Sequence, residues 1–479
     1  MEKLSNIISF FKSSGIFRTA ELLSEQLQTE VYVVGGYVRD QFLGRQSKDI
    51  DFLVIGDGLA FAQAYAAKLG KGATLSVFKN FGTAHIQYKH FNLEFVGARK
   101  ESYLRDSRKP KVQQGSLTDD LSRRDFTINA LAISLNPHNY GHLVDLFNGM
   151  DDMKKKIIRT PLEPDKTYSD DPLRMMRAIR FATQLDFEMD KQTFDAINRN
   201  VDRLGIISFE RISDELNNIM MATRPSTGFF MMHDTGILDY ILPELIELKG
   251  TETVNNKSHK DNFYHTLKVL DNIALLSDDL WLRWAALLHD IGKPLTKYFD
   301  SNAGWTFHGH EIAGSKMVTQ VFRRLKLPLH HKMKYVKKLV YLHLRPVALT
   351  KEEITDSAVR RLIVDAGDDI EDLLLLCKAD ITSKHQDKVK QYISRFDMVH
   401  QNIIEVTEKD RLRNWKNPVT GELIMQTFDI KPSKQVGLIK ERIKEAILEG
   451  EISNDFDAAY DLMIKIAKEY NLKAVNKSK

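Results

Sequence analysis

Hydrophobic residues recur with two different periods along the chain. Between residues 31 and about 150, short β-branched and aromatic runs such as Val31–Val34 and Phe52–Ile55 alternate with helical segments, which is typical of a mixed α/β region. Residues 1 to about 30, and nearly everything from about 156 onward, have helical spacing with no convincing strand pattern and no internal repeat. The pattern therefore predicts an α+β protein, with a mixed sheet near the N-terminus and helical domains after it.

Polar stretches mark the expected domain boundaries. Gly250–Ser258 is one, and the region from 385 to 415 is another, because His385–Lys390 and Asn414–Pro418 both break the helical pattern. Beyond it, two helical faces are predicted at Val436, Ile439, Ile443 and Ile447 and at Ala459, Leu462, Met463 and Ile466, before a frayed basic tail at Lys473–Lys479. We predict four domains, at residues 1–155, 156–250, 259–390 and 400–479.

The segment from 101 to 122 interrupts the α/β pattern. It is polar, partly basic and without periodicity, so we expect a mobile loop. A regular segment then begins at Arg123-Arg124-Asp125 and ends near Leu135.

Composition narrows the class of protein. The 479 residues include 69 Lys and Arg against 65 Asp and Glu, a net charge of +4, so a nucleic-acid surface has to be a local patch. The single cysteine, Cys377, excludes an intrachain disulfide and fits a reducing cytosol. The N-terminal apolar residues are interrupted by polar ones, and no run approaches the roughly 20 apolar residues of a membrane span. We expect a soluble, cytoplasmic protein.

The first group of candidate functional residues lies in the segment Val31–Asp51. After the first strand, Gly35-Gly36 allows a sharp turn with amide N–H groups free to face an anion, and the helical segment from Tyr37 adds a helix N-terminus. Asp49 and Asp51 lie two residues apart in the next strand and so share a face. Two carboxylates beside a phosphate-binding turn suit divalent metals and phosphoryl chemistry.

Glu94 belongs to a further predicted strand, on the face opposite Phe91, Leu93 and Phe95. It is either a third carboxylate beside Asp49 and Asp51 or a solvent-facing strand residue. The sequence favours neither interpretation.

A second motif, Asp170 to Phe181, predicts a helix with an Asp cap and Pro172 in its first turn. Asp171 and Arg174 are three residues apart and thus neighbours on one face. A salt-bridged surface helix is one interpretation. The other is base recognition, because cytosine and adenine both present an amino donor beside a ring-nitrogen acceptor, which an Asp acceptor next to an Arg donor matches without a template.

Five motifs in order between residues 31 and 216 resemble those of the class II tRNA nucleotidyltransferases (CCA-adding enzymes) and the related bacterial poly(A) polymerases. They are G-G-Y-V-R-D with D-I-D, R-R-D-F-T-I-N-A, V-D-L-F-N-G-M-D-D-M-K-K-K-I-I-R-T, D-D-P-L-R-M-M-R-A-I-R-F and E-R-I-S-D-E-L. One departure is visible, because the family usually has Glu-Asp where this chain has Asp170-Asp171. That leaves Asp171 intact and a role for Asp170 open.

The resemblance implies a polymerase-β-like nucleotidyltransferase head at 1–155 and a helical neck at 156–250 that selects the nucleotide. Asp49 and Asp51 would hold Mg²⁺. From its strand position, we include Glu94 with them as a candidate catalytic residue. The resemblance also implies a triphosphate site at Gly35, Gly36, Arg39, Arg123, Arg124 and Asn129. The incoming CTP or ATP would be contacted by Asp171, Arg174 and Arg177. Arg211 and Glu215 would brace the neck.

A second candidate site lies in the helical half. His289-Asp290 ends an apolar helix, where an unpaired buried Asp would be costly. A cation would satisfy His265, His289, Asp290 and Asp380 together, with ligands that fit Mn, Ni, Fe or Zn. His310, which completes the ligand set we predict, and His343 leave room for a second metal ion.

This H…HD…D order resembles the HD-superfamily metal phosphohydrolases, which some bacterial CCA-adding enzymes carry behind the neck. The resemblance implies an HD domain at 259–390. The region from 421 on, which begins G-E-L-I-M-Q-T-F, resembles the C-terminal part of the bacterial CCA-adding enzymes, which implies a tRNA-binding tail at 400–479. Basic stretches at Arg323–Lys326 and Lys332–Lys338 are either RNA-tracking surfaces or solvated helix faces.

We therefore expect an enzyme that adds or repairs the 3′-terminal CCA of tRNA from CTP and ATP, using Mg²⁺, with a second metal-dependent phosphohydrolase activity in the HD domain. Its partners would be the tRNA 3′ end and the two nucleotides, with no membrane and no DNA. Two alternatives remain open: a poly(A) polymerase, and an HD phosphohydrolase or phosphate sensor whose head only binds nucleotide.

Overall fold

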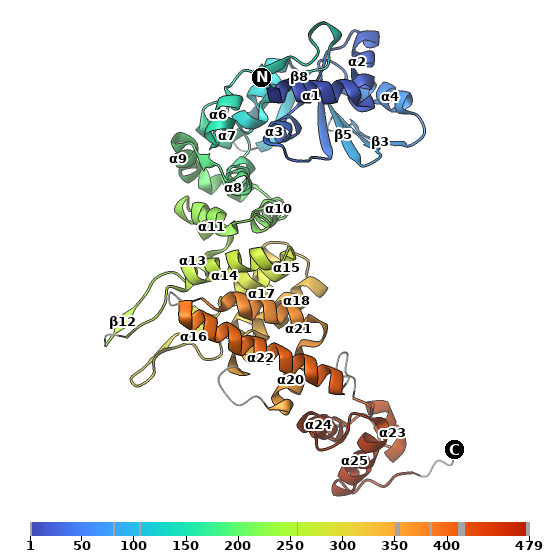
Figure 1. The fold of residues 1–479 in the computed structure, drawn as a ribbon, viewed down its shortest axis with the longest axis vertical. Coiled ribbons are helices and arrows are strands. Elements are labelled where there is room, and N and C mark those ends of the chain that lie inside the picture. Colours follow the sequence, from blue (N-terminus) through green and yellow to red (C-terminus); the bar gives the residue numbers. More distant parts are fainter. Residues whose placement is uncertain are drawn as a thin grey trace. The chain divides into compact units, whose positions relative to one another are not determined.

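The computed structural model describes residues 2–79, 82–104, 107–255, 257–349, 355–382, 386–410 and 417–475. The chain forms two compact units, Met1–Ile241 and Leu242–Lys479 (Figure 1). The first contains the mixed sheet and the first helices after it, and the second is mainly helical. The predicted α+β class is confirmed.

The first unit opens with two helices and then has the predicted strand–turn–helix–strand order. Its elements as far as the fifth strand are α1 (Glu2–Ser13), α2 (Gly15–Leu27), β1 (Val31–Val34), α3 (Gly36–Leu43), β2 (Asp49–Val54), α4 (Gly58–Leu69), β3 (Ala73–Phe78), β4 (Thr83–Tyr88) and β5 (Phe91–Gly97).

A seven-stranded sheet carries this unit, in the order β3-β4-β5-β2-β1-β8-β9, where β8 is Leu131–Ser134 and β9 is Leu143–Asp145. Neighbouring strands are antiparallel except β2 and β5, which run parallel. That parallel pair sets Asp51 directly beside Glu94.

Different helices cover the two faces of the sheet. On one face, aromatic side chains of α2 and α4 pack on the strands, and the rings of Phe52 and Phe95 stack with centroids 4.6 Å apart. On the other face, Leu53 belongs to a cluster with Leu121 of α5 (Leu117–Ser122). Because side chains alternate along a strand, Asp51 points to the same side as Leu53, towards α5 and the residues that follow it.

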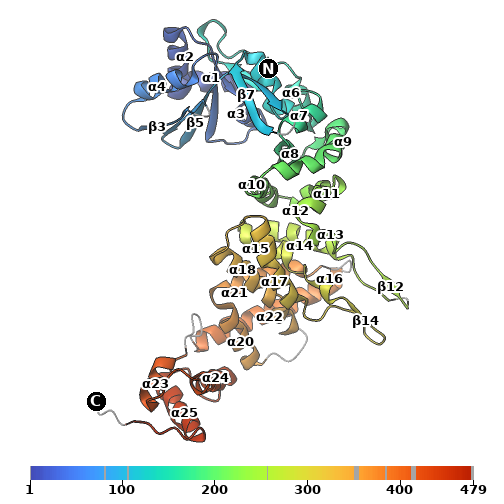
Figure 2. The ribbon, with the colours of Figure 1, turned by 180° about the vertical axis from the view of Figure 1, so that it is seen from behind.

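The predicted mobile loop at 101–122 is wrong. The structure has an antiparallel hairpin of β6 (Arg99–Leu104) and β7 (Ser107–Gln114), seen from behind in Figure 2, followed by α5. Backbone hydrogen bonds hold a two-stranded ladder and need no alternation of hydrophobic residues, so the sequence carried no strand signal there. A capping box between Ser116 and Asp119 begins α5.

The rest of the first unit is mostly helical and contains the second motif. Its elements are η2 (Thr127–Asn129), η3 (Pro137–Asn139), α6 (Gly149–Lys155), β10 (Ile157–Ile158), α7 (Pro164–Asp170), α8 (Leu173–Leu185), β11 (Glu188–Met189), α9 (Lys191–Asn200), η4 (Val201–Ile206), α10 (Phe209–Met220), α11 (Pro225–Asp234) and α12 (Ile237–Ile241).

The helix predicted to begin at Asp170 begins later. Asp170 ends α7, and α8 starts at Leu173. The N-cap is Pro172, and the Asp171 side chain before it accepts a hydrogen bond from Leu173 N through Oδ1 at 3.2 Å.

In the second unit, one group of helices surrounds the second candidate site, and the last three helices form a separate tail. Its elements are α13 (Pro243–Ile246), β12 (Thr253–Val254), β13 (Lys257–Ser258), α14 (Asn262–Leu276), α15 (Leu280–Leu288), α16 (Lys293–Thr296), β14 (Tyr298–Asp300), β15 (Gly304–Thr306), α17 (His310–Arg324), α18 (His331–Leu342), α19 (Leu344–Leu349), α20 (Asp356–Ala366), η5 (Gly367–Asp369), α21 (Ile370–Asp380), α22 (Gln386–Asp410), α23 (Gly421–Phe428), α24 (Lys434–Glu449) and α25 (Phe456–Glu469).

Two features of the helical half differ from the prediction. Short ladders pair β10 with β11, β12 with β13 and β14 with β15, and strands of two or three residues are too short to give a period-two signal. Within the region 385–415, where a boundary was predicted, α22 continues to Asp410 and packs on α20 and α21.

The tail helices follow the predicted pattern. Val436, Ile439, Ile443 and Ile447 of α24 and Ala459, Met463 and Ile466 of α25 are buried in one cluster, with Leu462 packed against it. Residues 476–479 of the predicted basic tail lie outside the described residues. Within the described parts of the chain, no helix combines the length and the apolar character that crossing a membrane requires.

Candidate functional site

The turn after β1 brings the predicted phosphate-binding residues together. Gly35 has a φ of +77°, and a Cβ there would lie 2.7 Å from Arg124 Nη1 and 3.5 Å from Asp51 Oδ2. Glycine is required both by the backbone conformation and by the close approach of these side chains. The turn is thus bordered by a guanidinium group and a carboxylate.

Arg39 closes the other side of the turn. Its buried side chain reaches back over α3, so that a Cβ on Gly36 would lie 3.5 Å from Arg39 Nη2. Arg39 Nη1 donates to Asn129 Oδ1 at 2.7 Å, and Asp40 forms an ion pair with the same guanidinium. Four of the six residues expected at a triphosphate therefore surround one turn, and Asn129 orients Arg39.

The remaining one of the six, Arg123, is held differently from Arg124. A fully buried carboxylate, Asp120, accepts from Arg123 Nε and from Arg124 Nη2, each at 3.0 Å. Arg124 extends to Gly35, whereas the Arg123 guanidinium pairs with Asp120. Of the two arginines, Arg124 is the one at the turn.

The three acidic residues lie in the neighbouring central strands β2 and β5, towards the edge of the sheet where these two strands begin. Asp51 pairs in register with Glu94, and Asp49 accepts a hydrogen bond from Asn92 Nδ2 at 2.7 Å. Burial raises the pKa of Asp51 to about 6, with Glu94 and Asp49 adding to the rise and Arg124 opposing it. The carboxylates therefore repel one another, as in a site that a cation neutralises. Mg²⁺ is commonly held by one or two carboxylates together with substrate phosphates, which fits this open edge.

A buried chain of polar groups joins the turn to α8. Asp125 accepts from Asn129 Nδ2 at 3.0 Å and from Arg177 Nη2 at 2.6 Å, while Asn129 holds Arg39. Burial acts to raise the pKa of Asp125, but the charge of Arg177 and the hydrogen bond from Asn129 outweigh it and hold the pKa well below its ordinary range. Arg39 and Arg177 are thus positioned through one carboxylate.

Replacing Asp125 with Asn is expected to destabilise the first unit by about 2 to 3 kcal/mol, because a charged hydrogen-bonded pair is lost. Since folding depresses the pKa of Asp125, its stabilisation is complete above an unfolded pKa of about 3.9 and declines as the pH falls through the folded value. Urea unfolding of the two proteins at pH 7 and near pH 3 measures this, and the difference should shrink at the lower pH, which lies below the unfolded pKa. Asp165→Asn, which removes the exposed bidentate partner of Arg199, is the control. A difference independent of pH would contradict the assignment.

The residues predicted to recognise the base lie in and just before the start of α8. Arg174 Nη2 donates to the carbonyl oxygen of Arg123 at 2.7 Å, and the Asp171 carboxylate lies 3.8 Å from Arg211 Nη2. Arg180 pairs with Glu215 of α10 at 2.5 Å. Arg211 and Glu215 therefore contact the α8 region, where a bracing role was expected of them, and Arg174 ties α8 to the R-R-D segment.

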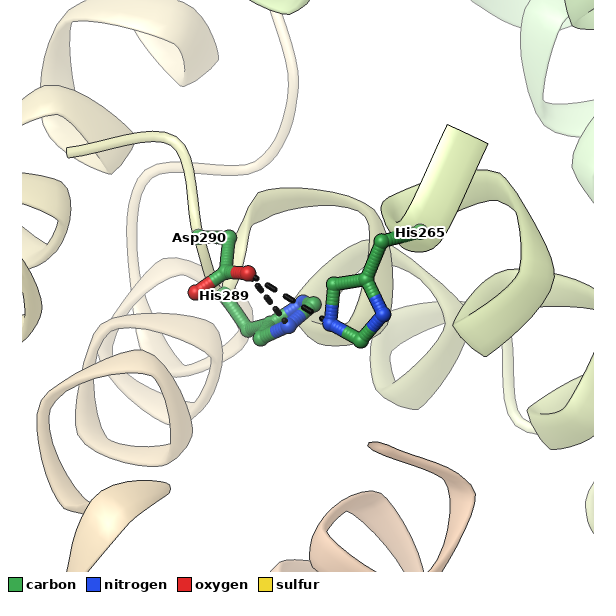
Figure 3. Close-up of side chains that lie close together, drawn as sticks. All are labelled: His265, His289 and Asp290. Atoms are coloured by element: carbon green, nitrogen blue, oxygen red, sulfur yellow. Dashed lines mark ion pairs between the residues drawn. The ribbon is translucent and has the colours of Figure 1, made fainter. Parts of the chain in front are cut away.

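The second unit contains a compact His and Asp cluster (Figure 3). His265 and His289 both direct Nε2 at Asp290 Oδ2, at 3.5 and 3.2 Å, and at Asp380 Oδ1, at 2.9 and 3.6 Å. On the other side of Asp290, His310 Nε2 lies 3.3 Å from Oδ1 and His343 Nε2 lies 3.9 Å from it. Two potential three-ligand groups result, and they share Asp290.

The far nitrogen of each imidazole is fixed. Nδ1 of His289, His310 and His343 faces the carbonyl oxygen of Ala286, Phe307 and Val340, respectively, at 2.6 to 2.8 Å, and Nδ1 of His265 faces Thr382 Oγ1 at 2.9 Å. Such outer contacts leave Nε2 as the ligating atom and orient the rings. All five residues predicted as ligands converge, together with His343.

The charges of this cluster call for a cation. Burial acts to lower the pKa of His289, but Asp290 and Asp380 outweigh it and raise it to about 10. Burial and the neighbouring His289 lower the pKa of His343 to about 4. The buried His289 Nε2 has no partner of hydrogen-bond geometry among the described residues, although Asp290 Oδ2 lies 3.2 Å away. An imidazole nitrogen of this kind between two carboxylates fits a divalent metal ion, which would take the place of the proton.

Family models match this chain in the order that the motifs predicted: a nucleotidyltransferase head, an RNA-binding region and an HD domain. The model of the poly A polymerase head domain matches residues 31–159, that of the probable RNA and SrmB-binding site of polymerase A matches 186–248, and that of the HD domain matches 262–383. The A-adding tRNA nucleotidyltransferase of Deinococcus radiodurans is 31% identical over 436 residues, which cover 89% of this chain and 93% of that protein.

The chain belongs to the tRNA nucleotidyltransferase family. A CCA-adding enzyme of Lactobacillus helveticus is 32% identical over 63% of this chain and 70% of its own length. The structure of a CCA-adding enzyme in complex with CTP has the same fold, with a TM-score of 0.64, 21% identity and coverage of 97% of this chain and 98% of that one. The family assignment expected from the five motifs is confirmed.

Within this tRNA nucleotidyltransferase, sequence reasoning missed the residues that hold the others in place. Asp120, Asp125 and Asp40 each hold an arginine that was predicted to contact the triphosphate or the base. Asp120 and Asp125 flank the R-R pair, so their position beside two arginines was the available signal. In the second site, Lys293 Nζ donates to Asp290 Oδ2 at 2.6 Å, and nothing in the sequence pointed to that contact.

Proposed function

We propose that this tRNA nucleotidyltransferase adds the 3′-terminal CCA of tRNA from CTP and ATP. The observation that carries the proposal is the convergence of Gly35, Arg124 and Asp51 on one turn, with Arg39 joined through Asn129 and Asp125 to the base-recognition helix. It joins a phosphate-binding turn, a carboxylate edge and a nucleotide-selecting helix in a single unit. The family's A- and CCA-adding members support it.

In the reaction, the 3′-hydroxyl oxygen of the RNA attacks the α-phosphorus and pyrophosphate leaves. The Gly35 turn, Arg39 and Arg124 would hold the triphosphate so that the leaving group is fixed. Asp49 and Asp51, with Glu94 beside them, would hold Mg²⁺, which supplies positive charge to the reacting oxygens. Asp171 and Arg174 would present an acceptor and a donor to cytosine or adenine, and Arg177 is positioned for the same nucleotide by Asp125.

Replacing Gly35 with Ala is expected to raise the KM for CTP and ATP about tenfold or more. The new Cβ displaces the Arg124 guanidinium, whose charge-assisted contacts to phosphate are worth about 1.5 to 3 kcal/mol. Steady-state kinetics with each nucleotide at saturating tRNA measures the change.

Gly44→Ala is the matched control, since Gly44 has a φ of +71° but nothing within 4 Å of its Cβ position. Gly44 lies in the left-handed helical region (ψ 25°), where an alanine costs about 1 to 2 kcal/mol, whereas Gly35 has ψ −139° and its replacement carries more strain. Only Gly35→Ala should alter KM. Equal KM values in the two variants would show that Arg124 does not bind the triphosphate.

Addition of A alone is a second candidate, favoured by the A-adding relative that covers most of the chain. A tRNA lacking CCA, one ending in C and one ending in CC, each incubated with Mg²⁺ and labelled CTP or ATP, separate the two. Incorporation of two C and then one A supports CCA addition, and incorporation of A only into the CC-ending tRNA supports the second candidate. Long A tails would indicate a poly(A) polymerase, and no incorporation would contradict both proposals.

The HD domain supports a second proposal, a metal-dependent phosphohydrolase activity on nucleotide or cyclic phosphate ends. Its support is the pair of ligand groups that share Asp290. An imidazole and carboxylate set of this kind fits a divalent transition metal. With tRNA and nucleoside triphosphates as substrates, we place both activities in the cytoplasm. The family does not favour a sensor whose head only binds nucleotide.

A further inference from the structure

A positively charged surface forms where α17 ends and α18 begins. Residues 312–349 contain nine Lys and Arg and no Asp or Glu, in a chain whose charges are otherwise nearly balanced. The two helices lie side by side and run through this segment (Figures 1 and 2). A charge run usually becomes a solvated helix face paired with acidic neighbours, so the pairing of each charge decides its meaning.

Three of the nine charges are neutralised by other parts of the second unit. Arg324 pairs with Glu244, Lys338 with Asp369 and Arg345 with Asp365. Among the described residues, no carboxylate lies within ion-pair distance of the other six. Four of these six lie around the junction of the two helices, and we call them the basic surface: Arg323, Lys326, Lys332 and Lys334.

Arg323, in the last turn of α17, stabilises that helix, but the two lysines of the basic surface at the start of α18 do not stabilise theirs. α18 begins at His331 with no side-chain cap and no acidic residue in its first turn, where Lys332 and Lys334 lie instead. Cations are unfavourable at a helix N-terminus, because the free amide groups there already carry partial positive charge. An anion would satisfy both the amides and the lysines. Folding alone therefore does not explain why the positive charges gather here.

The surface is separate from the metal cluster. His310 begins α17 and His343 follows the last residue of α18, so the cluster lies at one end of this helix pair and the basic surface at the other. α17 has 15 residues and thus a length of about 22 Å at 1.5 Å per residue. A phosphate bound at the basic surface is not a substrate of the metal cluster.

The residues of the basic surface fit a nucleic-acid backbone better than a small anion. Four cations distributed over two helix ends match successive phosphates of a strand, whereas a single phosphate would need only one or two of them. Lys332 Nζ lies 5.9 Å from the ring centroid of Trp281, so an aromatic side chain lies among the cations, as on surfaces that bind RNA strands. Arg323, Lys326 and Lys334 are exposed.

We propose that the basic surface binds the phosphate backbone of the tRNA substrate, away from its 3′ end. The inference rests on the proposed function, which makes tRNA the polyanion that the protein binds. The HD region then contributes to substrate affinity through its far end, independently of the metal cluster.

The test uses the full chain and fluorescently labelled tRNA lacking CCA, with the dissociation constant measured from 50 to 200 mM salt. Lys326→Gln with Lys334→Gln should raise the dissociation constant about tenfold at low salt and lower the salt slope by about two. The KM for CTP at saturating tRNA should stay unchanged. Lys297→Gln with Lys338→Gln is the control, because it removes two charges that are paired with Glu252 and Asp369 in the same unit.

Equal affinities and salt slopes for the two double variants would overturn the proposal. So would loss of binding to a polyglutamate peptide with unchanged tRNA binding, because the surface would then serve an acidic protein. Failure of the proposed function is distinct, since it appears as absence of nucleotide incorporation by the unaltered protein in the same tRNA solutions.

Discussion

Asp51→Asn is expected to lower the rate of nucleotide incorporation into tRNA by about 10³-fold or more, with little change in tRNA affinity. Asp51 lies where the carboxylate edge meets the Gly35 turn, 3.5 Å from the Cβ position of Gly35 and in register with Glu94. Loss of its charge removes a metal ligand, and metal stabilisation of a phosphoryl-transfer transition state is worth several kcal/mol, or about three powers of ten in rate. Single-turnover incorporation of labelled CTP at saturating tRNA measures the change.

Asp57→Asn is the matched control for this variant. The Asp57 side chain caps α4 through Leu59 N and Ala60 N, and Asn caps a helix about as well as Asp. The control should keep the full rate. A loss of less than tenfold in Asp51→Asn would exclude this carboxylate as the main metal ligand and would direct attention to Asp49 or Glu94.

The first half of the site was predictable because its signals are local. The strand, the glycine turn and the two aspartates follow one another within Val31–Asp51, and each depends on a short-range rule of backbone geometry. Glu94 shows the limit of that reasoning. Its strand face could be read from alternation, but its place beside Asp51 depends on the parallel pairing of β2 with β5, which no local pattern specifies.

The residues that orient the arginines could not be predicted for a related reason. Asp120 is fully buried and Asp125 nearly so, yet in the sequence both belong to a polar segment around an R-R pair. Whether such an aspartate is a solvated loop residue or a buried anchor depends on which helices cover it. Here Asp120 lies on α5 and accepts from Arg123 and Arg124, and Asp125 accepts from Arg177 of α8. The position of α5 depends on the hairpin before it, which the sequence pattern missed.

In the HD domain, the ligand types were predictable and their grouping was not. Adjacent His289-Asp290 at the end of an apolar helix signalled a buried polar pair, and His265 and Asp380 followed from the family order. The two oxygens of Asp290 face different pairs of histidines, which is a property of side-chain orientation. His343 thereby becomes a ligand candidate equal to His310.

Asp290→Asn is therefore expected to remove both metal ions from the HD domain and any phosphohydrolase activity with them, whereas His310→Gln should remove only one. The shared carboxylate supplies an oxygen to each ligand group, and an amide is a much weaker ligand for divalent transition metals. Metal content per chain after dialysis, measured by elemental analysis, should fall to near zero in the first variant and to about half in the second.

Asp387→Asn, which replaces an exposed carboxylate of α22, is the control and should keep the full metal content. Because Asp290 and Asp51 belong to separate units, nucleotide incorporation should be unchanged, and the helical circular dichroism and thermal unfolding of Asp290→Asn, compared with those of Asp387→Asn, check that the second unit is folded. Equal metal loss in Asp290→Asn and His310→Gln would mean that the cluster holds a single ion.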